Sequence, residues 1–187
     1  MHSKKLRKRF ESVILVHLGQ AYNLAMWLLH DSTDAEDIVQ QSCIRAYKGF
    51  SQFRNDNAAG WFLTIVRNTS YNHLKQKQKA QNLVSFDEMA HSSDESAQST
   101  LCTLSLNPEQ LMEIGAQKGL VKKSMSKLSP ENREIIYLRE IAGYSYKEIA
   151  SIVELPIGTI MSRLSRARCQ LRKILINQQA KEQANAV

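Results

Sequence analysis

The last third of the chain contains a run of cations with no acid among them. Between Ile157 and Leu175 there is no Asp or Glu, and the basic residues are Arg163, Arg166, Arg168, Arg172 and Lys173. Cations along a helix neutralise phosphates, and small polar side chains near its N-terminal end can reach base edges in the major groove of DNA. Thr159 and Ser162 stand at that end. The pattern indicates a DNA-recognition helix, although a merely solvated basic helix has the same composition.

Two shorter helical segments precede the basic one. Ser129-Pro130 has the residue types expected at a helix start, and Gly143 is expected to end that helix. Ser145 and Glu148 have the spacing of a capping box, in which each side chain satisfies a free amide of the next helix. The basic segment has its own apolar face, predicted at Ile160, Leu164, Ala167, Leu171 and Ile174. A helix, a short helix, a tight turn and a long helix together predict a helix-turn-helix unit.

The N-terminal part of the chain predicts three amphipathic helices. Apolar residues recur every three or four positions from Phe10 to Leu28, from Thr33 to Phe50 and from Ala58 to Lys79. Thr33 and Glu36 have the spacing of another capping box. Three such helices can bury their apolar faces against one another in a small bundle.

An acidic stretch separates the two basic parts. Net charge is +6 over residues 1–79, −6 over 80–117 and +7 over 118–187. Residues 83–107 are rich in Ser, Thr, Asp and Glu and lack periodicity, as a flexible tether does. An ordinary solvated linker would look the same. We therefore predict an all-α protein with two small domains, an N-terminal helical bundle (1–80) and a C-terminal helix-turn-helix domain (119–187), joined by a flexible acidic linker (81–118).

Several classes of site are disfavoured. Cys43, Cys102 and Cys169 are odd in number and widely spaced, which argues against a disulfide framework or a zinc site and favours a reducing, cytoplasmic location. The carboxylates at 34, 36 and 37 are better explained by helix capping than by catalysis, so neither an enzyme nor a metal or cofactor site is expected. No apolar run is expected to reach the roughly 20 residues of a membrane span, so no membrane insertion is expected.

The C-terminal motifs resemble region 4 of extracytoplasmic-function (ECF) sigma factors. The matching segments are 128–130, 144–150 and 158–168, the last with the highly specific string GTxxSRLxRAR. The resemblance implies that the basic helix reads the promoter −35 element. It places base-edge contacts at Met161, Ser162, Ser165 and Arg166, and phosphate contacts at Thr159, Arg163 and Arg168. Met161 stands where family members often have a cation, so the −35 preference at that position is open.

The N-terminal motifs resemble region 2 of the same family, in segments 35–40, 46–47 and 60–68. Asp37, Gln40, Gln41 and Ile44 fall on one helical stripe away from the apolar face. By itself such a stripe favours an ordinary solvated surface. The resemblance implies that Asp37 and Gln40 dock on the clamp helices of the largest RNA polymerase subunit.

Region 2 of the family also captures the melted −10 element, and the resemblance places this function after residue 52. Unpaired bases are held by stacking and by hydrogen bonds to their edges, with cations along the backbone. The residues assigned are Phe53, Arg54, Asn55, Asn57, Arg67, Asn68, His73 and Lys75. Flipped-base contacts are implied near Phe53 and Asn68. Phe53 could instead be a core residue and Asn68 a surface residue, and Trp61 is expected in the core.

The resemblance implies a sigma factor that directs core RNA polymerase to promoters and helps to melt the −10 element, as ECF factors do in stress responses. Expected partners are the polymerase clamp helices and the flap of its second-largest subunit, −35 duplex and −10 non-template DNA, and an anti-sigma factor. No catalysis and no cofactor are expected. The alternative is a stand-alone helix-turn-helix regulator that binds operators as a dimer, but no heptad or apolar patch indicates a dimer interface.

Overall fold

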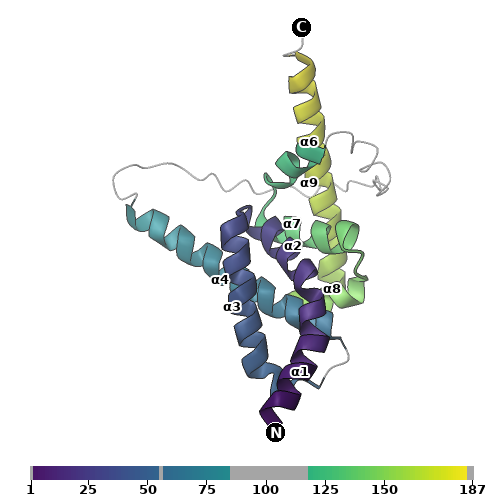
Figure 1. Cartoon of the computed structure of the whole chain (residues 1–187). Helices are drawn as coiled ribbons and strands as arrows, with labels where there is room; N and C mark the ends of the chain where they lie inside the picture. The colour runs from purple at the N-terminus through teal and green to yellow at the C-terminus, as the bar shows by residue number, and fades with distance from the viewer. Residues whose placement is uncertain (1, 55–56, 85–117, 185–187) are drawn as a thin grey trace.

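The computed structural model describes residues 2–54, 57–84 and 118–184, and every regular element within them is helical (Figure 1). In order, the elements are α1 (His2–Ile14), the 3-10 turn η1 (Leu15–His17), α2 (Leu18–Leu29), α3 (Ser32–Gly49), the 3-10 turn η2 (Phe50–Gln52), α4 (Ala58–Val84), α6 (Lys118–Met125), α7 (Pro130–Ile136), the π-helical turn η4 (Tyr137–Ile141), α8 (Tyr146–Val153) and α9 (Ile157–Ala184). The all-helical prediction is confirmed. The linker prediction falls largely on residues outside the described ranges.

Helices α1–α4 form the N-terminal lobe. Helices α2, α3 and α4 contact one another pairwise, and α1 leads into α2 through η1 (Figure 1). The apolar face of each helix is buried at this junction, as at Leu24 of α2, Ile38 of α3 and Phe62 of α4. The single helix predicted from Phe10 to Leu28 is therefore interrupted, although its inward residues are those that the periodicity indicated.

The start of α3 differs from the prediction. Asp31 is the N-cap, and its Oδ1 accepts a hydrogen bond from the backbone N–H of Asp34 at 2.9 Å. Thr33 lies inside the first turn, so the expected capping box between Thr33 and Glu36 is wrong. Asp ranks above Thr as an N-cap, and α3 begins directly after Asp31.

Helices α6–α9 form the C-terminal lobe, in which the predicted caps are confirmed. Ser129 caps α7 with Pro130 in the first turn, and Ser145 and Glu148 form the complete capping box of α8. Gly143 has a φ of +76°, which a glycine adopts without strain, and lies in the turn between η4 and α8. Helix α9 is 28 residues long and extends beyond the rest of the lobe (Figure 1).

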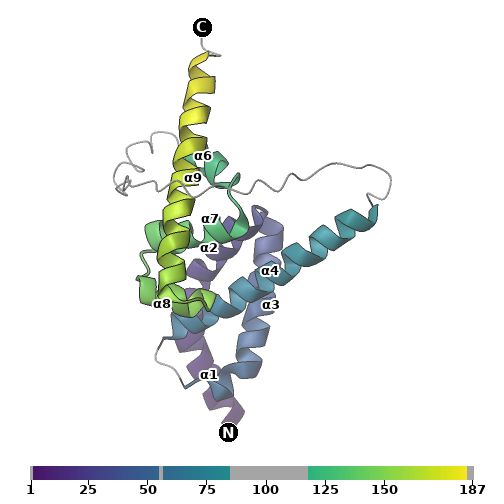
Figure 2. The same cartoon turned by 180° about the vertical axis from the view of Figure 1, so that it is seen from behind.

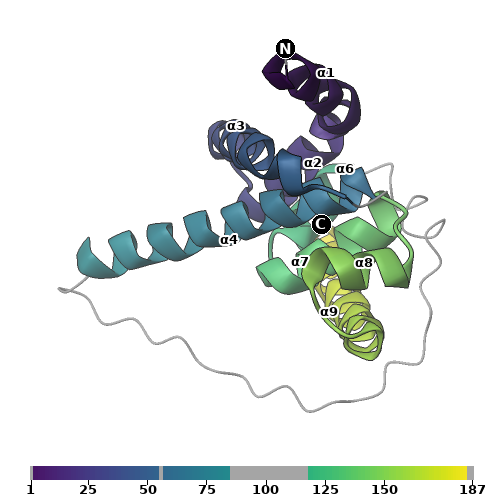
Figure 3. The ribbon, with the colours of Figure 1, turned by 90° about the horizontal axis from the view of Figure 1, so that it is seen from below.

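The two lobes pack directly against each other. Helix α4 contacts α8, and α2 contacts α7 and η4. Figures 2 and 3 show α4 crossing between α3 of its own lobe and the α7–α9 unit, while its C-terminal end extends away from both. This arrangement brings residues of α4 and α7 together that are far apart in the sequence.

The segment Lys4–Leu29 is long and apolar enough to cross a membrane by length and composition alone, contrary to the sequence prediction that no such run exists. The fold accounts for part of this apolar character, since 28% of the tested window is buried. Ala21, Leu24, Ala25 and Leu28 are buried against the other helices of the N-terminal lobe. Core helices pass the same test of length and composition.

Ser145→Ala should destabilise the C-terminal lobe. It removes the acceptor of the Glu148 N–H and the donor to the Glu148 carboxylate, so we expect the free energy of unfolding to fall by about 1 kcal/mol in urea titrations followed by circular dichroism. Hydrogen bonds from Ser145 lower the pKa of Glu148, so this contribution is present above the usual carboxyl pKa and is lost as the pH falls through the lowered value. Ser151→Ala, at an exposed position of the same helix, is the control. Equal effects of the two substitutions would contradict the prediction.

Candidate nucleic-acid interface

The outer face of α9 presents a stripe of four exposed side chains near its N-terminal end. They are Met161, Ser162, Ser165 and Arg166. The opposite face is fully buried at Ile160, Leu164 and Ala167, so the helix cannot rotate without exposing its core residues. Met161 is 54% exposed although it is apolar. The base-edge residues predicted from the sequence are thus brought together on one accessible surface, which we call the α9 stripe.

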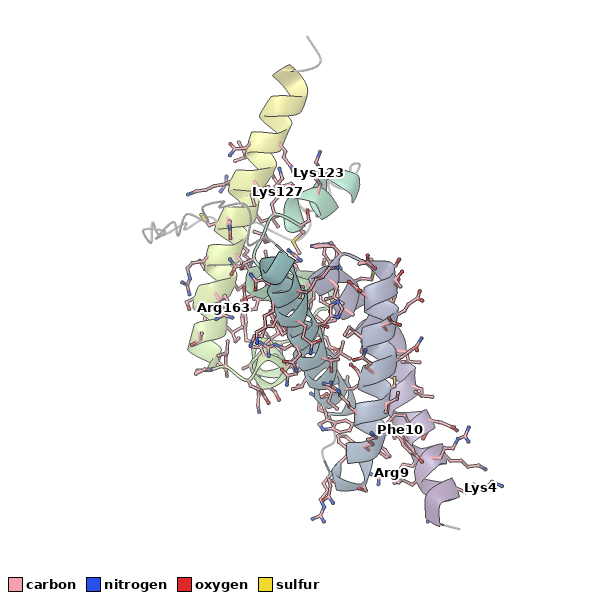
Figure 4. The ribbon with its side chains drawn as sticks, turned by 90° about the vertical axis from the view of Figure 1, so that its left-hand side faces the viewer. Lys4, Arg9, Phe10, Lys123, Lys127 and Arg163 are labelled. Carbon is pink, nitrogen blue, oxygen red and sulfur yellow. The ribbon has the colours of Figure 1, made fainter. Side chains whose placement is uncertain are left out.

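The cations along α9 occupy different environments. Arg163 is half-buried and lies near the N-terminal end of α9 (Figure 4). Arg168 is also half-buried and contacts Glu140 of η4 through two nitrogens, with its Nε 2.9 Å from Glu140 Oε1. The Arg168 guanidinium therefore links α9 to η4, whereas a phosphate contact was predicted for it.

A second exposed stripe lies on α3. Asp37, Gln40, Gln41 and Ile44 are all exposed there, and the Ile44 side chain is 58% exposed. We call these four residues the α3 stripe. Tyr47 continues it by one turn with an edge-to-face contact on Phe10 at 5.2 Å between ring centroids. Sequence reasoning missed Tyr47, although its spacing from Ile44 was a usable signal.

The segment between α3 and α4 has a buried aromatic anchor. Phe53 is 7% exposed, stacks on Phe50 at 5.7 Å and packs against Trp61 at 4.8 Å between centroids. Phe53 therefore packs as a core residue, which was one of the two alternatives given for it. Trp61 is half-buried in the same cluster. Arg54 beside it is exposed.

Residues 55 and 56 of this segment, which include the predicted Asn55, lie outside the described residues. Asn57 has a structural function, because its Oδ1 accepts a hydrogen bond from the Gly60 N–H at 2.8 Å at the start of α4. A Cβ on Gly60 would lie 2.7 Å from the Asn57 amide nitrogen. Glycine is needed at this position for the cap to close.

The predicted −10 residues of α4 do not all face solvent. Asn68 and Lys75 are exposed. The side-chain Oδ1 of Asn68 accepts a hydrogen bond from Arg67 Nη1 at 3.1 Å. Arg67 itself faces the C-terminal lobe, with Nε 2.8 Å from Glu134 Oε1. His73 Nε2 lies 3.2 Å from an Asp34 carboxylate oxygen.

Asp34 is a residue that sequence reasoning assigned only to helix capping. Its carboxylate contacts Lys77 Nζ at 2.9 Å as well as His73, and these interactions, led by the Lys77 hydrogen bond, lower its pKa. An acid of α3 therefore contacts both Lys77 and His73 of α4. No signal in the local sequence indicates a contact between positions 34 and 77. No group of three metal-ligating side chains occurs in the part of the chain that the structure describes.

Comparison with known proteins matches each lobe to a sequence profile. The sequence profile of sigma-70 region 2 matches residues 13–80, and that of sigma-70 region 4 matches residues 118–171. The chain is 37% identical over 138 residues to the ECF RNA polymerase sigma-E factor of Salmonella typhimurium, covering 73% of this chain and 71% of that protein. The chain belongs to the ECF sigma factors. It is therefore an RNA polymerase sigma factor, as the sequence motifs implied.

Further relatives and structures support the family. The RNA polymerase sigma-H factor of Pseudomonas aeruginosa is 28% identical over 90% of this chain and 87% of its own length. The sigma factor RpoE of Bartonella quintana, solved with the anti-sigma factor NepR, has a TM-score of 0.64 at 29% identity over 90% of this chain and 97% of that one. CnrH, solved with the cytosolic domain of CnrY, shares the fold with a TM-score of 0.57 at 20% identity over 91% and 90%.

The stand-alone regulator is not favoured, because such a protein needs only the helix-turn-helix lobe. The match to region 2 covers the N-terminal bundle, which that alternative leaves unexplained. ECF sigma factors act in transcription initiation, and both lobes contribute to that function.

Arg168→Ala should destabilise the C-terminal lobe, whereas Arg166→Ala should not. The Glu140 side chain is 8% exposed, so removal of its partner leaves a nearly buried charge unpaired. We expect a loss of about 1–3 kcal/mol for Arg168→Ala in chemical denaturation. The double variant with Glu140→Ala should recover part of this loss, because the two effects are coupled. Additive effects in this cycle would show that the ion pair does not stabilise the lobe.

Proposed function

We propose that α9 reads the −35 element through the α9 stripe. The observation that supports it best is the exposure of Met161, Ser162, Ser165 and Arg166 on one face of a helix whose opposite face is locked in the core. Arginine pairs with guanine in the major groove, serine bonds to several bases, and a thioether makes apolar contact with a thymine methyl group. Thr159 and Arg163 are proposed to contact phosphates. The main role proposed for Arg168 is to hold α9 in position through its ion pair with Glu140. Contact with a phosphate is proposed as its lesser role.

The N-terminal lobe is proposed to capture the melted −10 element with the α4 face and the loop before it. Asn68 offers an exposed amide that can both donate to and accept from an unpaired base, while Arg54 and Lys75 are exposed cations for the backbone. Arg67 and His73 are proposed to join this surface after their pairs with Glu134 and Asp34 have opened. Phe53 is proposed to support the loop from within the aromatic cluster, and Asn57 through its cap.

The α3 stripe is proposed as the docking site for the polymerase clamp helices. It combines a carboxylate and two amides with the exposed apolar side chain of Ile44, a composition suited to a reversible protein interface. The C-terminal lobe is proposed to contact the flap of the second-largest subunit. We propose domain boundaries at 1–80 and 119–187, with 81–118 as linker; the profile matches over 13–80 and 118–171 support a division into two domains.

An anti-sigma factor is a further proposed partner, since the Bartonella quintana sigma factor of similar structure was solved with one. We also propose a cytoplasmic location, where core polymerase and promoter DNA are found, and a non-enzymatic role without a cofactor. The sigma factor would make or break no bond itself. Its contribution would be the binding free energy that positions polymerase and stabilises the open bubble.

Arg166→Ala should reduce transcription from promoters that depend on a −35 element. The guanidinium is exposed on the α9 stripe, and loss of one bidentate base contact costs about 1–3 kcal/mol, or roughly ten- to a hundredfold in promoter affinity. Run-off transcription with purified core enzyme on a genomic library would identify promoters and measure the loss. Lys173→Ala removes an equal charge from an exposed position farther along α9 and should have a small effect. Comparable losses in both variants would indicate general electrostatics in place of base reading.

Asp37→Ala combined with Gln40→Ala should weaken binding to core polymerase without unfolding the lobe. Both side chains are exposed, so their removal creates no cavity. We expect the dissociation constant in a fluorescence binding titration with core enzyme to rise about tenfold or more, as for hot-spot residues. Glu36→Ala, an exposed acid on the same helix, is the charge-matched control. Unchanged core binding by the double variant would mean that the docking surface lies elsewhere.

A further inference from the structure

The N-terminal half of α1 carries a dense run of cations. Five of the six residues from 4 to 9 are basic, and all five are exposed: Lys4, Lys5, Arg7, Lys8 and Arg9. Glu11, the one acid of the helix, has its Oε1 2.8 Å from Arg7 Nε. Among the residues that the structure describes, no acid lies within ion-pair distance of the other four cations. We call these four, Lys4, Lys5, Lys8 and Arg9, the α1 band.

The spacing of the α1 band places its members side by side on the helix. Lys4 and Lys8 are four residues apart, and so are Lys5 and Arg9, so each pair shares a face. Like charges at this spacing destabilise a helix, and cations near the N-terminal end of a helix oppose its dipole. The band therefore does not serve the stability of α1 itself. A bound anion would offset both unfavourable effects.

The α1 band lies beside the segment that is proposed to hold the −10 element. The Arg9 guanidinium is 5.4 Å from the centroid of the Phe50 ring, and Phe50 stacks on Phe53. Arg54, which follows directly, is exposed. The N-terminal half of α1 and the C-terminal end of α3 lie at the same end of the lobe (Figure 1), and Figure 4 shows Arg9 beside the end of α3 with Lys4 farther out. The band thus continues the cationic surface that begins at Arg54.

The form of the α1 band favours the sugar–phosphate backbone of DNA as its partner. Lys and Arg side chains bind phosphates without regard to base sequence. Arg9 remains exposed while it lies over the Phe50 ring, so its N–H groups can still donate to an oxygen. The band extends for about 8 Å along the helix, at 1.5 Å per residue. A row of cations on an open helix surface suits a chain of phosphates better than one small anion.

An anionic membrane surface is the main alternative partner for a basic helix. A helix that lies in a membrane interface buries an apolar face among the lipids. The apolar face of α1 is already packed in the lobe, where Phe10 and Ile14 are buried. Phe10 also makes edge-to-face contacts with the rings of Tyr47 and Phe50, each at 5.2 Å between centroids. No apolar face of this segment is left for lipid, which favours DNA.

We propose that the α1 band binds the phosphate backbone of promoter DNA next to the melted −10 element. This rests on the proposed capture of that element by α4 and the loop before it. The band extends the −10 surface with contacts that do not depend on base sequence, whereas Asn68 contacts a base. Phosphate contacts release counterions from DNA, so the contribution of the band decreases as the salt concentration rises.

Binding of the holoenzyme, the sigma factor with core polymerase, to a labelled promoter fragment tests the proposal. The fragment carries an unpaired −10 element with its flanking DNA and ends before the −35 element. Lys5→Ala combined with Lys8→Ala should weaken binding by about two- to thirtyfold in fluorescence anisotropy, as for the loss of two exposed ion pairs. The slope of log affinity against log salt concentration should become shallower by about 1–2. Lys5→Arg combined with Lys8→Arg should retain both the affinity and the slope.

Lys123→Ala combined with Lys127→Ala is the charge-matched control, because it removes two exposed cations from the C-terminal lobe (Figure 4). We expect little effect of this control on the fragment. Equal losses in the two double variants, or an unchanged affinity and slope in the α1 variant, would overturn the proposal. A loss of core binding in the α1 variant would assign the band to polymerase and overturn it as well. Flotation with phosphatidylserine vesicles that depends on the band, with unchanged DNA binding, would assign the band to lipid.

A photo-crosslinking residue in place of Lys4 tests the location of the contact. We expect adducts with DNA at or beside the −10 element, and adducts confined to polymerase subunits would contradict the proposal. Asn68→Ala separates the two levels of inference on the same fragment. Weaker binding by Asn68→Ala with no change in the α1 variant rejects the band alone. Weaker binding by the α1 variant with no change in Asn68→Ala rejects the proposed base capture.

Discussion

Burial of one apolar face on each helix is the constraint on which the remaining structure depends. In α9, Ile160, Leu164 and Ala167 are fully buried at steps of four and three residues, and this fixes which side chains face outwards. The same constraint acts on α3 through Ala35, Ile38 and Ala46. Neither exposed stripe has to be held by dedicated interactions, since rotation of the helix would expose its core.

The ion pairs of the two lobes leave different cations exposed. On α9, Arg168 is paired with Glu140, so Arg166 is the exposed guanidinium of the α9 stripe. On α4, the acids Asp34 and Glu134 each hold cations that could otherwise meet DNA. A net positive charge therefore overstates the number of free cations, and the distribution of ion pairs decides which side chains can contact phosphates.

Much of the architecture was predictable because it is encoded locally. Ser129-Pro130 and the pair Ser145 and Glu148 start helices where capping rules place them. The start of α3 was mispredicted, because the prediction relied on the capping-box spacing of Thr33 and Glu36, whereas Asp31, the better N-cap type, starts the helix. Motifs long enough to be specific also indicated the family, which the comparisons then established.

The sequence by itself determined the helices, their buried faces and the two exposed stripes, because residues three and four positions apart share a face of any α-helix. Tertiary structure alone decided that Phe53 joins Phe50 and Trp61 in a core cluster and that Arg67 meets Glu134 across the lobes. No helical periodicity relates Phe53 to Trp61 or Arg67 to Glu134. They follow from how α4 crosses the neighbouring helices, which depends on the fit of all their side chains together.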